Sequence, residues 1–135
     1  MKKLNFIFIV PFILFNCTNK FKSLENELLI IDNNILTRDL IVIPKEGCAG
    51  CILNATHYVE NNIDRIKENI LFTDIQDIKL FKLKVDSGFL NNEKVFLDTQ
   101  NKVKSKEIGI YPVLIETKDG EIISVSDYSA PVKSK

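Results

Sequence analysis

Apolar residues along this chain form short continuous runs that alternate with stretches of helical spacing. Residues 40–43 (Leu-Ile-Val-Ile) are an apolar run ended by Pro44, which is typical of a strand buried on both faces. From about residue 51 to residue 69, apolar residues recur at intervals of three or four and predict an amphipathic helix. The residues on its apolar face are Ile52, Ala55, Val59, Ile63, Ile66 and Ile70.

The later part of the chain continues this alternation. Asp119-Gly120 is a strong two-residue hairpin signal, and the pattern behind it over residues 121–125 predicts the returning strand. Residues 28–31 fit a strand or a helical turn equally. The remaining runs predict strands at 71–75, 94–98 and 113–116. Over residues 77–84, Ile78, Phe81 and Val85 fit a helix whereas Phe81, Leu83 and Val85 fit strand alternation, and we predict the helix. This order of elements predicts an α/β fold with a mixed central sheet.

The N-terminus has the layout of an export signal. Lys2 and Lys3 precede a charge-free run over residues 4–15. A membrane-spanning helix needs about 18 or more apolar residues, so this run is too short. Pro11 inside the run disfavours a buried core helix. We therefore expect residues 1–16 to be a cleaved signal peptide.

The leader ends in Leu14-Phe15-Asn16-Cys17, which resembles the bacterial lipobox, although that motif usually has small residues before its cysteine. The resemblance implies that Cys17 becomes the first mature residue and carries a lipid. The alternative is cleavage nearby, with Cys17 an ordinary residue. Residues 17–26 are then interpreted as a polar tether and residues 27–135 as the folded domain.

The length, composition and charge of the chain exclude some classes of function. The chain has 135 residues, enough for one domain, and its 45% hydrophobic and 27% charged residues indicate a globular protein. Its 18 basic and 18 acidic side chains create no net field that would favour nucleic acid. No basic cluster interleaved with aromatic residues is present, so we expect no nucleic-acid partner.

The candidate chemistry lies in Cys48-Ala49-Gly50-Cys51, between the strand at 40–43 and the following helix. A thiol at a helix N-terminus faces unpaired backbone N–H groups and the positive end of the helix dipole, which favour its thiolate. Cys51, one turn further on, reaches back to Cys48 and allows a disulfide. Cys48 would attack a substrate disulfide and Cys51 would resolve the mixed disulfide.

Other interpretations of the cysteine pair remain open. A zinc site needs about four ligands, and beyond the pair the chain offers only His57 and Cys17, so we expect neither a metal nor another cofactor. A structural disulfide is a stronger alternative because an exported chain meets an oxidising compartment. So short a loop, however, contributes little stability. The Pro-x-x-x-Thr/Ser-x-x-Cys pattern of peroxiredoxins is absent, since no hydroxyl residue lies between Pro44 and Cys48.

A strand, a Cys-x-x-Cys pair at a helix start, a distant x-Pro before a strand and a Lys-Asp-Gly-Glu hairpin together resemble the thioredoxin-like fold. Within it, the chain is most similar to extracytoplasmic, membrane-tethered redoxins related to TlpA and ResA, over about residues 36–126. The matching stretches are 96–102, 108–115 and 119–123. The resemblance implies a three-layer sandwich with helices flanking the sheet. It also implies that Pro112 is a cis-proline beside the disulfide and that Tyr111 offers its backbone to a substrate segment.

The chain departs from the family at three places. Gly47 stands where thioredoxins carry Trp, Ala49-Gly50 replaces a Pro-containing pair, and Val42 occupies the place of a buried acid. Near the pair, the charge of Lys45 would support a thiolate at Cys48, whereas Glu46 would oppose it. We therefore expect the cysteine pair to be redox-active, at an exchange rate that need not match that of a thioredoxin.

The resemblance implies a membrane-tethered extracytoplasmic thiol–disulfide oxidoreductase that acts on protein disulfides. Its partners would be exported proteins with thiols or disulfides, a membrane electron donor or acceptor, and the lipid anchor. Its location would be the cell envelope, anchored to a bacterial membrane and facing the periplasm or the exterior. The alternative is a non-catalytic thioredoxin-like binding lipoprotein in which Cys48–Cys51 is a structural disulfide.

Overall fold

The computed structural model describes residues 19–131, so the expected signal peptide (1–16) and the expected lipidation site, Cys17, lie outside the described residues. Within this part of the chain the elements are α1 (Lys22–Ile31), β1 (Leu40–Pro44), α2 (Ala49–Asn62), β2 (Asn69–Thr73), α3 (Ile78–Lys84), α4 (Ser87–Leu90), β3 (Val95–Leu97), β4 (Val113–Lys118) and β5 (Glu121–Asp127).

The five strands of the described residues form one sheet in the order β3-β2-β1-β4-β5. β1, β2 and β3 are parallel, whereas β4 is antiparallel to β1 and β5 is antiparallel to β4. At the middle of β1, Val42 pairs with Leu71 of β2 on one side and with Val113 of β4 on the other. The α/β fold with a mixed central sheet, predicted from the sequence, is confirmed.

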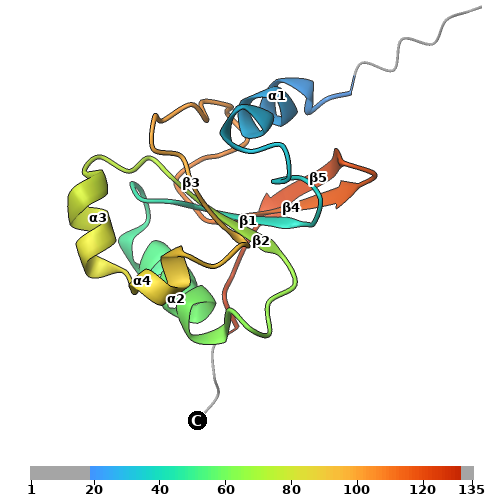
Figure 1. Ribbon diagram of the computed structural model, residues 1–135. Helices are drawn as coiled ribbons and strands as arrows, with labels where there is room; N and C mark the ends of the chain where they lie inside the picture. The colour runs from blue at the N-terminus through green and yellow to red at the C-terminus, as the bar shows by residue number, and fades with distance from the viewer. Residues whose placement is uncertain (1–18, 132–135) are drawn as a thin grey trace, which may run out of the picture.

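Helices cover both faces of this sheet, with α1 on one face and α2, α3 and α4 on the other (Figure 1). Leu40 and Val42 of β1 pack in the apolar cluster under α1. Ile41 and Ile43 pack in the cluster under α2. Because successive side chains of a strand point to opposite faces, β1 needs an apolar residue at every position.

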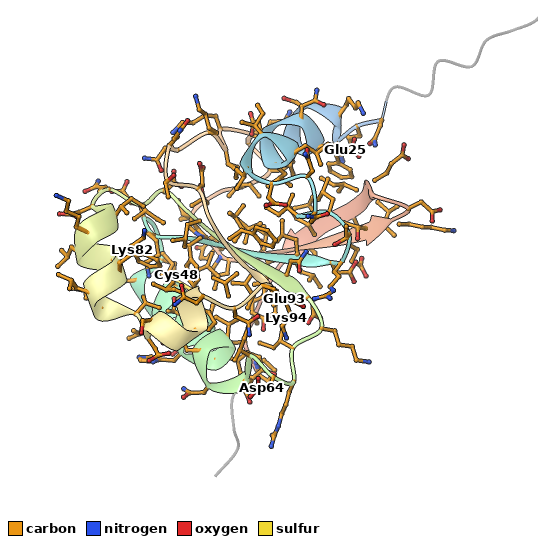
Figure 2. The ribbon with its side chains drawn as sticks, in the orientation of Figure 1. Glu25, Cys48, Asp64, Lys82, Glu93 and Lys94 are labelled. Atoms are coloured by element: carbon orange, nitrogen blue, oxygen red, sulfur yellow. A yellow bond between two sulfur atoms is a disulfide. The ribbon has the colours of Figure 1, made fainter. Side chains whose placement is uncertain are left out.

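α2 ends at Asn62, earlier than the apolar spacing predicts. Beyond it, the Nζ of Lys94 (labelled in Figure 2) donates to the carbonyl oxygens of Ile63 (2.5 Å) and Ile66 (2.7 Å). Ile66 is buried in the loop that follows the helix, and Ile70 is buried in β2. The helical spacing therefore continues through a loop and into a strand, because all three segments contribute to one apolar cluster.

The interpretation of residues 17–26 as a tether is wrong from Lys22 onward, where α1 begins. Leu24 is fully buried, and Glu25 is only 2% exposed. The Glu25 carboxylate (Figure 2) accepts hydrogen bonds from the Ile122 N–H at 2.9 Å and from Asn19 Nδ2 at 2.6 Å. These contacts join α1 to β5, so the folded domain includes the end of the segment assigned to the tether. Residues 28–31 are helical.

Other boundaries follow the sequence more closely. The helix predicted at 77–84 is α3. The Asp119-Gly120 hairpin is confirmed, and both residues have a positive φ, 54° and 76°, as a tight hairpin turn requires. The short helix α4 is not anticipated by any periodicity. It forms because the Asp86 side chain accepts from the Phe89 N–H (2.8 Å) and buries the Phe89 ring against Phe72.

Candidate redox site

Cys48 and Cys51 form a disulfide at the start of α2, with their Cα atoms 5.3 Å apart. Cys48 is the N-cap residue of this helix, and its Sγ accepts a hydrogen bond from the Cys51 N–H at 3.4 Å. Figure 2 labels Cys48 near the start of the helix. Both cysteines are half-buried. The predicted position of the pair, after a buried strand and at a helix N-terminus, is confirmed.

Gly47, the residue before the disulfide, allows a second chain segment, at Ile110, to pass close to it. Its φ is +136°, and a Cβ atom at this position would lie 2.7 Å from the Cα of Ile110. In the next residue, the Cys48 N–H donates to the Ile110 carbonyl oxygen at 3.0 Å. A tryptophan, the residue that thioredoxins carry here, is therefore excluded by both the backbone conformation and the contact with Ile110.

Tyr111 and Pro112 lie next to the disulfide, as the resemblance implies, but the bond between them is not cis. No cis peptide bond occurs in residues 19–131, so the expectation of a cis-proline is wrong. The trans isomer is the lower-energy form of an X–Pro bond. Pro112 is buried and its carbonyl oxygen accepts from the Tyr128 N–H at 2.8 Å, whereas the Tyr111 side chain is 47% exposed.

A groove of about 400 Å³ brings Cys51, Tyr111 and Pro112 together. It lies between the start of α2, the entry to β4 and the segment that leaves β5, which runs past α2 in Figure 1. The other lining residues are Asn54, Asp127, Tyr128, Ser129 and Ala130. Sequence reasoning missed these five. The pattern of α2 places Asn54 one turn after Cys51, but nothing in the sequence shows that residues 127–130 return to this helix.

The charged residues before Cys48 contact other parts of the molecule. The Lys45 Nζ lies 5.4 Å from the ring centroid of Phe81 and 5.7 Å from that of Phe72. Burial holds the pKa of Lys45 below its usual range, although Glu60 opposes this shift. The Glu46 side chain contacts Gln76.

Val42 is fully buried in the apolar cluster under α1. The position at which the resemblance to thioredoxins implies a buried acid therefore holds no carboxylate in this chain. A buried acid does occur elsewhere in the fold. Asp98, which is 1% exposed, accepts hydrogen bonds from the Thr73 hydroxyl (3.0 Å) and from the Lys102 (2.8 Å) and Val103 (2.9 Å) N–H groups. This carboxylate fixes the loop after β3.

His57 is not part of the disulfide site. Its side chain is 64% exposed on α2, and its Nδ1 lies 3.8 Å from Glu60 Oε2. Within residues 19–131, no three side chains of the His, Cys, Asp and Glu types gather closely enough to hold a metal ion. Among the helices of the same residues, none is both long and apolar enough to span a membrane.

The comparisons with known proteins found no matching protein-family model, no matching curated protein and no matching solved structure. The features of the molecule that bear on function are the disulfide, the groove and the surface around them. The surface beside the disulfide carries two exposed apolar side chains, Ile110 (56%) and Tyr111 (47%).

Proposed function

We propose that this chain is a thiol–disulfide oxidoreductase with a thioredoxin-like fold, acting on protein disulfides through Cys48 and Cys51. The observation that carries the proposal is the hydrogen bond from the Cys51 N–H to the Cys48 Sγ at the N-terminus of α2. After reduction, the same N–H group and the helix dipole favour a thiolate at Cys48. A thiolate is the attacking species in disulfide exchange.

The architecture supports the finer fold assignment. A parallel β1-α2-β2 unit with the cysteine pair between its first strand and its helix leads through β3 to an antiparallel hairpin. Helices lie on both faces of the mixed sheet. The Tyr111-Pro112 step enters β4 beside the disulfide, which is the second landmark of the resemblance.

The proposed reaction needs only the two cysteines. The Cys48 thiolate attacks one sulfur of a substrate disulfide, forms a mixed disulfide and expels the other substrate sulfur as a thiolate. The Cys51 thiol then loses its proton and attacks Cys48 Sγ, which releases the second substrate thiolate and restores the Cys48–Cys51 bond. The exposed side chains of Ile110 and Tyr111 supply apolar surface for a protein substrate.

We test this reaction with the Cys51→Ser variant, which keeps the attacking thiol and removes the resolving one. It should accumulate mixed disulfides with an oxidised test protein, visible on non-reducing gels and cleaved by dithiothreitol. The matched Cys48→Ser variant should trap far less. If Cys51→Ser traps nothing, and the wild-type protein neither reduces nor isomerises the test protein, the proposal fails.

The proposal extends to location. Lipidation at Cys17 would tether the protein in the cell envelope, facing the periplasm or the exterior, with exported proteins as substrates and a membrane protein exchanging electrons. Each buried methylene of a lipid chain contributes about 0.8 kcal/mol to anchoring. Cys17→Ala should therefore move the protein from the membrane fraction to the soluble fraction after cell lysis. Retention of this variant in the membrane would contradict the lipid anchor.

A non-catalytic binding lipoprotein remains the alternative, and the buried Val42 in place of an acid favours it. In that case the disulfide would be structural. The trapping experiment separates the two, because a structural pair forms no mixed disulfides with substrate proteins.

A further inference from the structure

The groove beside the disulfide is lined by only one of the two cysteines. Cys51 lines the groove, whereas Cys48 does not. In thiol–disulfide exchange the attacking sulfur approaches in line with the bond that breaks, on the side away from the leaving sulfur. A thiolate seated in this groove therefore meets Cys51 and would expel Cys48.

Cys48 is also the better leaving group of the pair. Its Sγ accepts the Cys51 N–H at the helix N-terminus, which stabilises negative charge on this sulfur. A disulfide cleaves faster when the departing thiolate is the more stable one. Attack from the groove would thus release the Cys48 thiolate, the species that the proposed function requires.

The groove also has a charge preference. Among the described residues that line it, Asp127 alone carries a formal charge at neutral pH. The register pairs Asp127 with Val113, so this carboxylate lies at the end of β5 beside Pro112. The remaining polar groups are the Asn54 amide, the Ser129 hydroxyl and the tyrosine hydroxyls. This lining favours a ligand with an ammonium group and hydrogen-bonding capacity.

We propose that this groove is a subsite for a low-molecular-weight aminothiol, which reduces the disulfide by attacking Cys51 rather than Cys48. The inference rests on the proposed function and names the electron donor of the same site. A volume of about 400 Å³ suits a small molecule.

The atoms and electrons balance over two steps. One aminothiolate attacks Cys51 Sγ, forms an aminothiol–Cys51 mixed disulfide and releases the Cys48 thiolate. A second aminothiolate attacks the aminothiol sulfur of that mixed disulfide and releases the Cys51 thiolate. The two thiols are oxidised to their own disulfide, and the protein pair takes up the two electrons.

The test uses three two-carbon thiols of nearly equal size: cysteamine (cationic), 2-mercaptoethanol (neutral) and mercaptoacetate (anionic). Each is used to reduce the oxidised full-length protein, and each rate is divided by the rate of the same thiolate with hydroxyethyl disulfide. The normalised rate of cysteamine should exceed that of mercaptoacetate by about threefold to fivefold, the size of one exposed charge interaction. Asp127→Asn should bring the ratio close to one, and Glu121→Gln, at the other end of β5, should leave it unchanged.

The second readout locates the adduct. Acid quenching early in the reaction, alkylation of free thiols and peptide mass spectrometry should find cysteamine on Cys51 and the alkyl group on Cys48. Cysteamine on Cys48, or a charge preference that survives Asp127→Asn, overturns the inference and leaves the proposed function intact. The absence of any charge preference also overturns it, as expected of a groove that holds a peptide segment. If none of the thiols reduces the disulfide, the proposed function itself fails.

Discussion

Single residues decide how the disulfide meets the rest of the molecule. Gly47 permits the close passage of Ile110, which in turn accepts the Cys48 N–H. Tyr128 lies beside Pro112: its N–H donates to the Pro112 carbonyl oxygen, and its side chain packs against the apolar cluster under α2. Neither role depends on the sulfur chemistry, so each can be tested through stability.

Gly47→Ala should destabilise the oxidised protein, because the new Cβ meets the Ile110 backbone at a φ of +136°. We expect a loss of about 1–3 kcal/mol in the free energy of unfolding, measured by urea denaturation. Gly109→Ala is the matched control, since a Cβ there has no atom within 4 Å. That variant should stay within about 0.5 kcal/mol of the wild type. Equal effects of the two substitutions would contradict the role assigned to Gly47.

The burial of Tyr128 leads us to predict a loss of stability at alkaline pH. Burial, assisted by Tyr58 and Glu68, raises the pKa of Tyr128 to about 12. In the unfolded chain a tyrosine loses its proton at about pH 10, so between about pH 10 and pH 12 the unfolded state binds fewer protons than the folded state. Stability must then fall as the pH rises through this window.

Tyr128→Phe removes the titrating hydroxyl, so the variant should gain stability relative to the wild type as the pH rises. Urea midpoints at about pH 8 and about pH 11.5 measure the change. Tyr111→Phe serves as the control because the Tyr111 side chain is 47% exposed. A constant difference between Tyr128→Phe and the wild type across both pH values would refute the assignment.

At the scale of elements, the continuous apolar run predicted β1, and the Asp119-Gly120 turn signal predicted the hairpin, because each is a local property of the sequence. Residues 77–84 fit both a helix and strand alternation, and they form α3. The end of α2 was not predictable in this way, since Ile66 and Ile70 continue the helical spacing outside the helix. The hydrogen bonds to the Ile63 and Ile66 carbonyl oxygens, just beyond the end of α2, come from Lys94, which is distant in sequence. The disulfide pair could be predicted from its local motif. The groove could not, because it forms only where residues 127–130 return to α2 in the folded chain.

At the scale of the whole molecule, the two faces of the sheet have separate apolar clusters that share β1 and β2. α1 covers one face, and the helix that carries the disulfide lies on the other (Figure 1). Two acidic side chains join α1 to distant segments. Glu25 binds the Ile122 N–H, and Glu27 binds the Lys104 and Ser105 N–H groups, each at 2.9 Å. Because β1 and β2 belong to both clusters, we expect both faces to unfold together.

Glu25→Ala tests this coupling. It leaves the buried Ile122 N–H without its acceptor, which should cost about 1–3 kcal/mol of the free energy of unfolding. Amide hydrogen exchange should show the loss in α1 and equally in α2, across the sheet from the substitution. Glu121→Ala, an exposed neighbour of Ile122 on β5, should change the stability by less than about 0.5 kcal/mol. A loss of protection confined to α1 would show that this helix opens on its own, and that the disulfide face keeps its structure without it.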